Sequence, residues 1–218
     1  MIYADHAATT KISETAKLAM LSAMEKDWYN PSSLYTPGQQ ASGTLMDARV
    51  RIAHCLGCLP KEIYFTSGGS EADNQAILSA AAIGKRQGKM HIISTAFEHH
   101  AVLHTLKKLE KEGFEITLLD VGEKGIVSPV QVEKAIRPDT ILVTVMYANN
   151  EIGTIQPIRE IGAICRKNGV LFHTDAVQAA GHLQINVEKD QIDMLSLSAH
   201  KFNGPKGIGV LYAKQAYF

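Results

Sequence analysis

Short, continuously apolar segments alternate along this chain with segments of helical period, and this alternation limits the fold more than any other feature. Several of the apolar segments, rich in Val, Ile, Leu and aromatic residues, are apolar on both faces. A strand of that kind needs cover on both sides, which is typical of parallel sheets flanked by helices. The segments predicted as strands are 63–66, 91–94, 115–121, 140–147, 170–174, 194–198 and 207–212.

Two intervening segments illustrate the helical pattern. In 98–112 the apolar residues recur three or four positions apart, which gathers them on one face. In 157–167 a proline opens the segment, isoleucines form a stripe, and a glycine follows the end. The alternation therefore predicts a doubly wound α/β domain. The last apolar segment follows Lys201 too closely for a crossover helix, so its strand is expected to run antiparallel.

The first 60 residues differ from the rest because turn signals interrupt them at 29–33 and at 36–38. We expect residues 1–60 to form an N-terminal helical arm with two helices. Residues 61–218 are then expected to form one large domain.

Charge and cysteine content argue against several classes of protein. The chain has 22 basic and 22 acidic residues, so its formal net charge is zero and nucleic acid binding is not expected. The longest mostly apolar stretch, 76–84, is far shorter than the ~18 to 20 residues of a membrane span. The first six residues do not resemble a secretory signal, and three cysteines, an odd number, fit a reducing compartment. We expect a cytoplasmic protein that does not bind membranes.

The turn after the first predicted strand has the features of an anion-binding site. Ligands of open α/β sheets bind beyond the carboxyl ends of the strands. Here Gly68 and Gly69 allow backbone N–H groups to approach a ligand at the start of a helix. Ser70 is a candidate cap for that helix, with Asp73 three residues on as in a capping box. An ordinary capped turn is the alternative, and no dinucleotide or ATP loop motif is present.

Two further strand ends carry a carboxylate and an amine. The segment 170–174 runs directly into Asp175, and a carboxylate buried there needs a cation or several donors. The alternative is a cap on the next helix. The segment 194–198 is followed by His200 and Lys201. A lysine of ordinary pKa, ~10.4, becomes a nucleophile only when it is desolvated or near other cations, and a solvated surface lysine is the alternative.

A fourth group of polar residues, at His99 and His100 and at 149–151, is not expected to bind metal. Adjacent imidazoles point apart on a helix, and no third ligand follows at metal spacing. Cys55 and Cys58 lack a second pair, and the helical pattern before them does not fit a redox motif.

Together the carboxyl ends of these predicted strands provide a possible anion-binding turn, a carboxylate, an amine and flat polar groups. Pyridoxal phosphate needs such a set: a helix N-terminus for its phosphate, a carboxylate for its pyridine nitrogen, a lysine for a Schiff base, and a plate to stack on the ring. The combination favours a pyridoxal phosphate site more strongly than any single element does.

Seven motifs then occur in order along the chain, at 3–10, 30–33, 66–71, 98–102, 149–153, 173–178 and 198–207. With them the sequence resembles the NifS/IscS branch of the cysteine desulfurases, in the class V aminotransferase group. The resemblance covers nearly all of this chain but only about the first half of a usual family member. It implies the large domain of a fold-type I pyridoxal phosphate-dependent transferase, without the family's C-terminal small domain. That domain has a mostly parallel seven-stranded sheet with one antiparallel strand and helices on both faces.

By this resemblance three residues are catalytic. Lys201 matches the Schiff-base lysine, Asp175 the partner of the pyridinium nitrogen, and His99 the imidazole that stacks on the ring and handles protons. Gln178 matches the residue that hydrogen-bonds the ring oxygen, and Asn150 the asparagine that meets the substrate carboxylate and the ring oxygen. The residues that match phosphate contacts are Gly69, Ser70, Ser198 and His200. His6, Ser70 and Ala199 replace the family's usual Asn, Thr and Gly.

The activity implied is removal of sulfur from L-cysteine, which gives L-alanine and a persulfide on an enzyme thiol. The resemblance also implies a homodimer and a sulfur acceptor or iron-sulfur scaffold protein as partner, in iron-sulfur cluster biogenesis. The family's nucleophilic cysteine and carboxylate-binding arginine match no residue of this chain. The three cysteines, Cys55, Cys58 and Cys165, are interpreted as core or structural thiols.

We therefore expect a truncated chain, or half of a split enzyme, that is weak or inactive alone. The alternatives are another pyridoxal phosphate reaction, such as selenocysteine lysis or transamination, and a non-catalytic interaction domain derived from a desulfurase.

Overall fold

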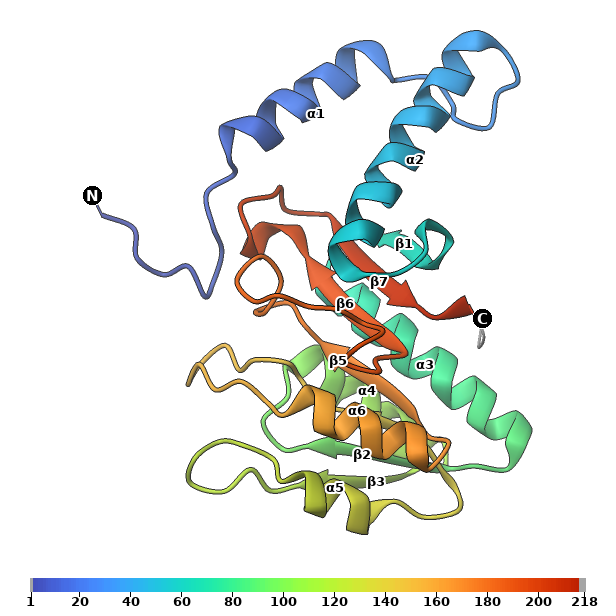
Figure 1. Ribbon diagram of the computed structural model, residues 1–218, viewed down its shortest axis with the longest axis vertical. Helices are drawn as coiled ribbons and strands as arrows, with labels where there is room; N and C mark the ends of the chain where they lie inside the picture. The colour runs from blue at the N-terminus through green and yellow to red at the C-terminus, as the bar shows by residue number, and fades with distance from the viewer. Residues whose placement is uncertain (1, 216–218) are drawn as a thin grey trace.

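A seven-stranded sheet forms the centre of the molecule, in a computed structural model that describes residues 2–215 (Figure 1). Its strand order is β1-β7-β6-β5-β4-β2-β3. The strands are β1 (Ile63–Thr66), β2 (His91–Thr95), β3 (Glu115–Leu119), β4 (Thr140–Thr144), β5 (Leu171–Asp175), β6 (Met194–Ser198) and β7 (Gly209–Ala213). Only β7 runs antiparallel to its neighbours, so the prediction of a mostly parallel sheet with one antiparallel strand is confirmed.

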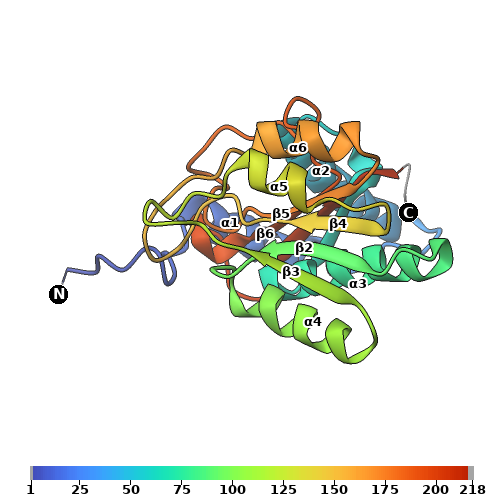
Figure 2. The same ribbon diagram turned by 90° about the horizontal axis from the view of Figure 1, so that it is seen from below.

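Helices cover both faces of this sheet (Figure 2). The helices are α1 (Glu14–Lys26), α2 (Thr36–Leu56), α3 (Gly69–Gln87), α4 (His100–Lys111), α5 (Pro129–Ala135) and α6 (Ile158–Lys167), with 3-10 turns η1 (Pro60–Glu62) and η2 (Ala199–Lys201). Helices α3 and α4 cover one face, and α5, α6 and the end of α2 cover the other.

Neighbouring residues of the central strands enter two different cores. Leu142 packs with α3 and α4, whereas Val143 faces α5 and α6, and both are fully buried. This double burial is the physical reason that the strands lack an alternating pattern.

Strand β4 ends earlier than the sequence pattern predicts. The apolar segment continues to residue 147, but the backbone N–H of Met146 donates to the carboxylate of Glu98 at 3.0 Å rather than to a neighbouring strand. Strand β3 likewise ends at Leu119 instead of residue 121. The N–H groups of Val145 and Tyr147 still donate to the carbonyl oxygens of His173 and Asp175, so a side-chain acceptor replaces a sheet hydrogen bond only at Met146. The candidate site lies at this edge of the sheet.

The N-terminal arm contains two helices, as predicted. Helix α1 buries no residue and stands away from the sheet, whereas α2 enters the core through Ala53 and Leu56. A domain boundary near residue 60 stays a prediction, and residues 216–218 of the predicted large domain lie outside the described part. Within residues 2–215, none of the helices combines the length and the apolar character needed to traverse a bilayer.

The start of β7 packs against the turn before α3. A Cβ placed on Gly209 would lie 2.5 Å from the carbonyl carbon of Gly68 and 2.7 Å from the carbonyl oxygen of Leu197. These are backbone atoms on both sides, so a side chain cannot be accommodated by a rotamer change.

We therefore expect Gly209→Ala to lower the free energy of unfolding by about 1 to 3 kcal/mol, the usual cost of overpacking. Gly43→Ala is the matched control, because Gly43 lies in α2 with open space around it. Alanine at this position is expected to raise the free energy of unfolding by about 0.5 to 1 kcal/mol. Urea unfolding followed by circular dichroism measures both. Equal midpoints for the two variants would contradict this packing argument.

Candidate active site

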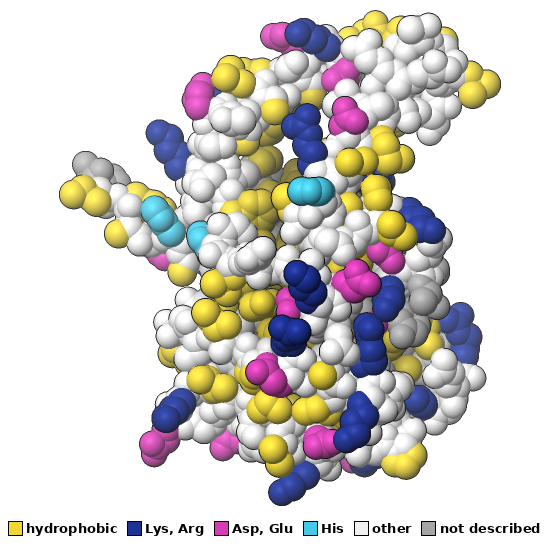
Figure 3. Space-filling model, in the orientation of Figure 1, with side chains coloured by type: hydrophobic (Ala, Val, Ile, Leu, Met, Phe, Trp, Pro, Cys, Tyr) yellow, Lys and Arg dark blue, Asp and Glu magenta, His cyan; other side chains and the backbone are white. Residues whose placement is uncertain are grey.

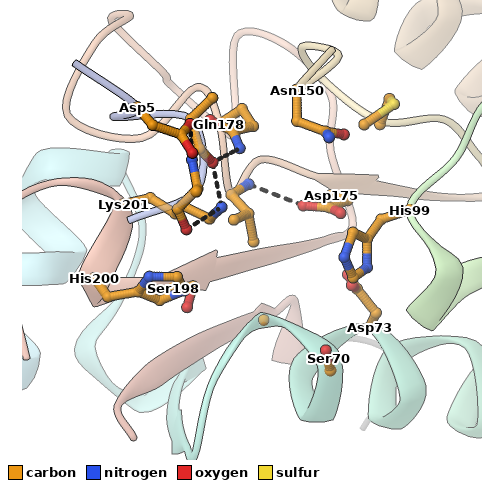
Figure 4. A pocket seen from close by; sticks show the side chains of 15 residues that line it. Asp5, Ser70, Asp73, His99, Asn150, Asp175, Gln178, Ser198, His200 and Lys201 are labelled. Carbon is orange, nitrogen blue, oxygen red and sulfur yellow. Dashed lines mark hydrogen bonds between the residues drawn. The ribbon is translucent and has the colours of Figure 1, made fainter. Parts of the chain in front are cut away.

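All the predicted site residues line one cavity of about 410 Å³ (Figure 4). The cavity lies where β5 and β6 end, beside the N-terminus of α3, and its size is in the usual range for small-molecule sites. The predicted residues that line it are Gly69, Ser70, His99, Asn150, Asp175, Gln178, Ser198, His200 and Lys201. Residues that the sequence analysis did not assign to a site also line it, namely Asp5, Ala7, Ala8, Asp73, Met146 and Val177.

The first turn of α3 forms one wall of the cavity through its backbone. A Cβ on Gly69 would lie 2.6 Å from a methyl carbon of Val177, so glycine allows the backbone to approach closely here. The prediction that Ser70 caps this helix is wrong, because the helix begins at Gly69 and its cap is Gly68, which has no side chain to bond with. Glu71 reaches back instead, and its carboxylate accepts from the backbone N–H and the hydroxyl of Ser67, each at 2.6 Å.

Polar groups gather in front of this helix turn. A smaller cavity of about 340 Å³ shares Gly69, Ser70, Ser198 and His200 with the first, and Lys206 also lines it. The His200 ring contacts the hydroxyl of Thr9 at 3.0 Å, and its pKa is lowered by burial and by the nearby Lys201 and Lys206. Hydroxyls, a neutral imidazole, a lysine and free N–H groups of a helix start suit an anion such as phosphate.

Asp175 ends β5 and is buried, with 5% of its surface exposed. No helix follows it, so the alternative of a helix cap is wrong; one carboxylate oxygen instead accepts from the N–H of Val177 at 2.9 Å. Burial raises its pKa, while the Val177 N–H and then His99 and Lys201 act in the opposite direction. The carboxylate is therefore held where a cation would stabilise it further.

Lys201 is half-buried at the opposite side of the cavity (Figure 4). Its amine donates to the carbonyl oxygens of Ala7 and, at 3.0 Å, of Ala8. Burial lowers the pKa of this amine, while Asp175 and Asp5 act in the opposite direction. The N-terminal segment thus orients the amine, a role that only the long-range fold reveals.

His99 is the cap residue of α4. Its Nδ1 accepts from the backbone N–H of Ala101 at 3.1 Å, so a neutral ring carries its hydrogen on Nε2. The ring lies beside Asp175 at the edge of the cavity (Figure 4). The helix start therefore selects both the tautomer and the orientation of the imidazole.

The two amide residues are placed by different contacts. Gln178 donates to the Ala7 carbonyl oxygen at 2.9 Å, so it contacts the same carbonyl group as Lys201. Asn149, beside Asn150, holds the loop by accepting from the N–H groups of Glu151 and Ile152 at 2.9 and 3.0 Å. This leaves Asn150 as the member of the pair that lines the cavity.

Two buried acids were missed as site residues. Asp73 lines the cavity instead of acting in a capping box. Glu98 is buried and accepts from the backbone N–H of Met146, which lines the cavity, and burial raises the pKa of Glu98 to about 8. The sequence does indicate that Asp73 is buried, because helical spacing places this residue on the apolar face of α3 with Ala76, Ile77 and Ala80. An acid on that face points to the sheet rather than to solvent.

The cysteines lie away from this cavity. Cys165 is buried as expected for a core thiol, and burial raises the pKa of Cys58 to about 12. Of the two interpretations of Cys55, a core or a structural thiol, the core interpretation is wrong because Cys55 is exposed near the end of α2. Among residues 2–215 no group of three or more His, Cys, Asp or Glu side chains has a metal-binding arrangement.

Comparison with known proteins identifies the relatives of this chain. A solved structure described as "SspA in complex with cysteine" superposes with a TM-score of 0.94 and 42% identity, over 99% of this chain and 62% of that one. Cysteine desulfurase IscS of Methanosarcina thermophila is 52% identical over 214 residues, which are 98% of this chain and 53% of that protein. Putative cysteine desulfurase IscS 1 of Bacillus subtilis (strain 168) is also 52% identical, over 98% of this chain and 56% of that protein.

The chain spans about half the length of the curated relatives it matches. The family described as Aminotransferase class-V matches residues 2–218. Because that match covers nearly the whole sequence, this chain belongs to the class-V aminotransferase family.

Proposed function

We propose that this chain binds pyridoxal phosphate and forms the cofactor-binding part of a cysteine desulfurase, which converts L-cysteine to L-alanine and transfers the sulfur to a thiol. The observation that carries the proposal is that the Lys201 amine and the Asp175 carboxylate line one cavity and influence each other's pKa. The relatives named cysteine desulfurase, and the solved structure described as SspA in complex with cysteine, support the substrate.

The donor set of the cavity fits pyridoxal phosphate. Gly69, Ser70, Ser198 and His200 would hold its phosphate, and Asp175 would pair with its ring nitrogen. Gln178 and Asn150 would contact its ring oxygen, with Asn150 also facing the substrate carboxylate. When bound, the cofactor supplies an electron-accepting ring that stabilises the charge left when a proton leaves the substrate.

Lys201 has the two properties that a nucleophilic lysine needs. Burial lowers its pKa, which raises the fraction of neutral amine, and two carbonyl groups orient its nitrogen. The same amine would hold the cofactor and, once released by substrate, would take up the substrate proton.

We infer that His99 does not act as a base that removes a proton from the substrate in this geometry. Its Nε2 already carries a hydrogen and can only donate, and protonation at Nδ1 would break the bond to the Ala101 N–H. We infer that the ring packs on the cofactor and donates a hydrogen bond from Nε2.

Family membership and the surface support a proposal for the partners and the location of this chain. We infer a homodimer, since the arm exposes apolar side chains, of which Leu18, Met24 and Trp28 are each more than half exposed. Figure 3 shows hydrophobic side chains on this arm and in the hollow beside it. A sulfur acceptor or an iron-sulfur scaffold protein would take the sulfur, and the free thiols agree with a cytoplasmic enzyme.

Covalent binding of the cofactor can be tested at Lys201. Purified protein incubated with pyridoxal phosphate and reduced with borohydride is expected to gain one reduced cofactor adduct at Lys201, that is, the mass of the cofactor less one water and plus two hydrogens, because that amine is the half-buried one in the cavity. Lys201→Ala should gain none, and Lys107→Ala, on the exposed side of α4, should behave as wild type. Intact-mass measurement and peptide mapping report the site, and labelling of another lysine would refute it.

Substitution of Asp175 can separate its effect on cofactor binding from its effect on the stability of the fold. Asp175→Asn is expected to weaken pyridoxal phosphate binding at least about 30-fold, which corresponds to the ~2 kcal/mol lost when one partner of a buried charge pair is removed. Because burial raises the pKa of Asp175, the cofactor-free fold loses stability as pH rises through that pKa, and the amide removes this loss.

The variant should therefore be at least as stable as wild type above neutral pH while binding worse. Absorbance titration and thermal unfolding without cofactor measure the two effects. A loss of stability that parallels the loss of binding would show that Asp175 has only a structural role.

Turnover of L-cysteine by the 218-residue chain can be measured directly. Its described cavity is lined by neither a cysteine thiol nor an arginine, so we expect cofactor binding with little or no sulfide release from L-cysteine. Sulfide and alanine are measured together. Rapid sulfide release would contradict this expectation, and a keto-acid product in place of alanine would indicate a transaminase.

A further inference from the structure

One acid of the cavity has no task in the chemistry proposed above. Asp73 lies one turn into α3, is only 1% exposed, and lines the cavity together with Asp175. Its Oδ1 is buried and has no hydrogen-bond partner within the described residues. An ionised carboxylate in that position would cost several kcal/mol.

The groups facing Asp73 from the sheet provide no compensating charge. The His173 ring on β5 lies close, with Nε2 3.6 Å from Oδ1, but burial lowers the pKa of His173 to about 3. Both of its nitrogens are already engaged, Nδ1 with the hydroxyl of Thr144 at 2.8 Å and Nε2 with that of Ser196 at 3.0 Å. This imidazole is therefore neutral and cannot pair with a carboxylate.

The other titratable neighbours oppose ionisation of Asp73. Asp175 on β5 and Glu98, in the connection between β2 and α4, are both buried acids that raise its pKa further, beyond the larger effect of burial. Of the described neighbours only the Ser196 hydroxyl, on β6, acts in the opposite direction.

Asp175 has better support for a negative charge than Asp73. It accepts a backbone N–H at 2.9 Å, and both His99 and Lys201 lower its pKa. When two neighbouring carboxyls share one site, the proton remains on the one with poorer solvation. In this pair that group is Asp73.

We propose that Asp73 is a positioning residue that stays a neutral carboxylic acid, so that Asp175 is the single negative group meeting the ring nitrogen of the cofactor. This inference rests on the proposed function for its ligand, but the neutral state of Asp73 belongs to the cofactor-free protein. A neutral acid near Asp175 does not repel the charge of that carboxylate. Asparagine has nearly the same shape and is also neutral, so it should replace Asp73 in this role.

The first test measures the cofactor-free protein. The unfolded chain releases the Asp73 proton near pH ~3.9, whereas the folded chain keeps it to higher pH, so the side chain destabilises the fold increasingly as pH rises. The Tm of Asp73→Asn minus that of wild type should therefore grow by at least about 3 °C between pH 5 and pH 9. Glu110→Gln, an exposed acid on α4, is the control and should give a constant difference. A constant difference for Asp73→Asn as well would overturn the proposal.

The second test measures pyridoxal phosphate binding by absorbance titration at pH 7. Asp73→Asn should bind within about threefold of wild type, and Asp73→Ala at least about tenfold more weakly, since truncation to alanine leaves a void in this wall of the cavity. The proposal is overturned if the asparagine variant binds as poorly as Asp175→Asn, or if the alanine variant binds as well as wild type.

The two tests separate failure of this inference from failure of the proposed function. If wild type does not bind pyridoxal phosphate, the proposed function is wrong, while the pH dependence of Tm still decides whether Asp73 is neutral. If wild type binds and the Tm difference stays flat, only the inference about Asp73 is wrong.

Discussion

Burial of carboxyl groups at the carboxyl edge of the sheet is the constraint on which the rest of this structure depends. Asp175 ends β5 where water has little access, and Asp73 and Glu98 lie buried around it. Apolar or amide side chains in these places would give a more stable fold, because desolvated acids cost free energy. Among these acids, Asp175 is the one that a cation at the cavity would stabilise, because Asp73 and Glu98 hold their protons to higher pH. A ligand with a protonated ring nitrogen meets that need.

The scaffold holds the groups opposite Asp175 through contacts between distant parts of the sequence. The carbonyl groups of Ala7 and Ala8 orient the Lys201 amine, and Thr9 contacts His200. On the other side, Gly209 lets β7 lie against the turn that opens α3. The cavity is thus assembled from the N-terminal segment, a helix start and two strand ends, and none of these forms a site by itself.

Local pattern was enough to predict the strands and most helices, because backbone hydrogen bonding and two-sided burial follow from neighbouring residues. It failed at the end of β4, where the Glu98 side chain takes the N–H of Met146. It also failed at Ser70, since which residue begins a helix is decided by how the preceding glycines pack. The candidate site residues came from the rule that ligands bind at strand ends and from the resemblance of the motifs.

The sequence by itself determined the succession of strands and helices along the chain, the cover on both faces of the sheet, and which polar residues lie at strand ends. Only the tertiary structure decided that Lys201 faces Asp175, that His99 carries its hydrogen on Nε2, and that Asp73 points inward. The physical reason is that secondary structure depends on near neighbours in the chain. The protonation state of a side chain depends instead on solvent access and on charges that folding brings from distant positions.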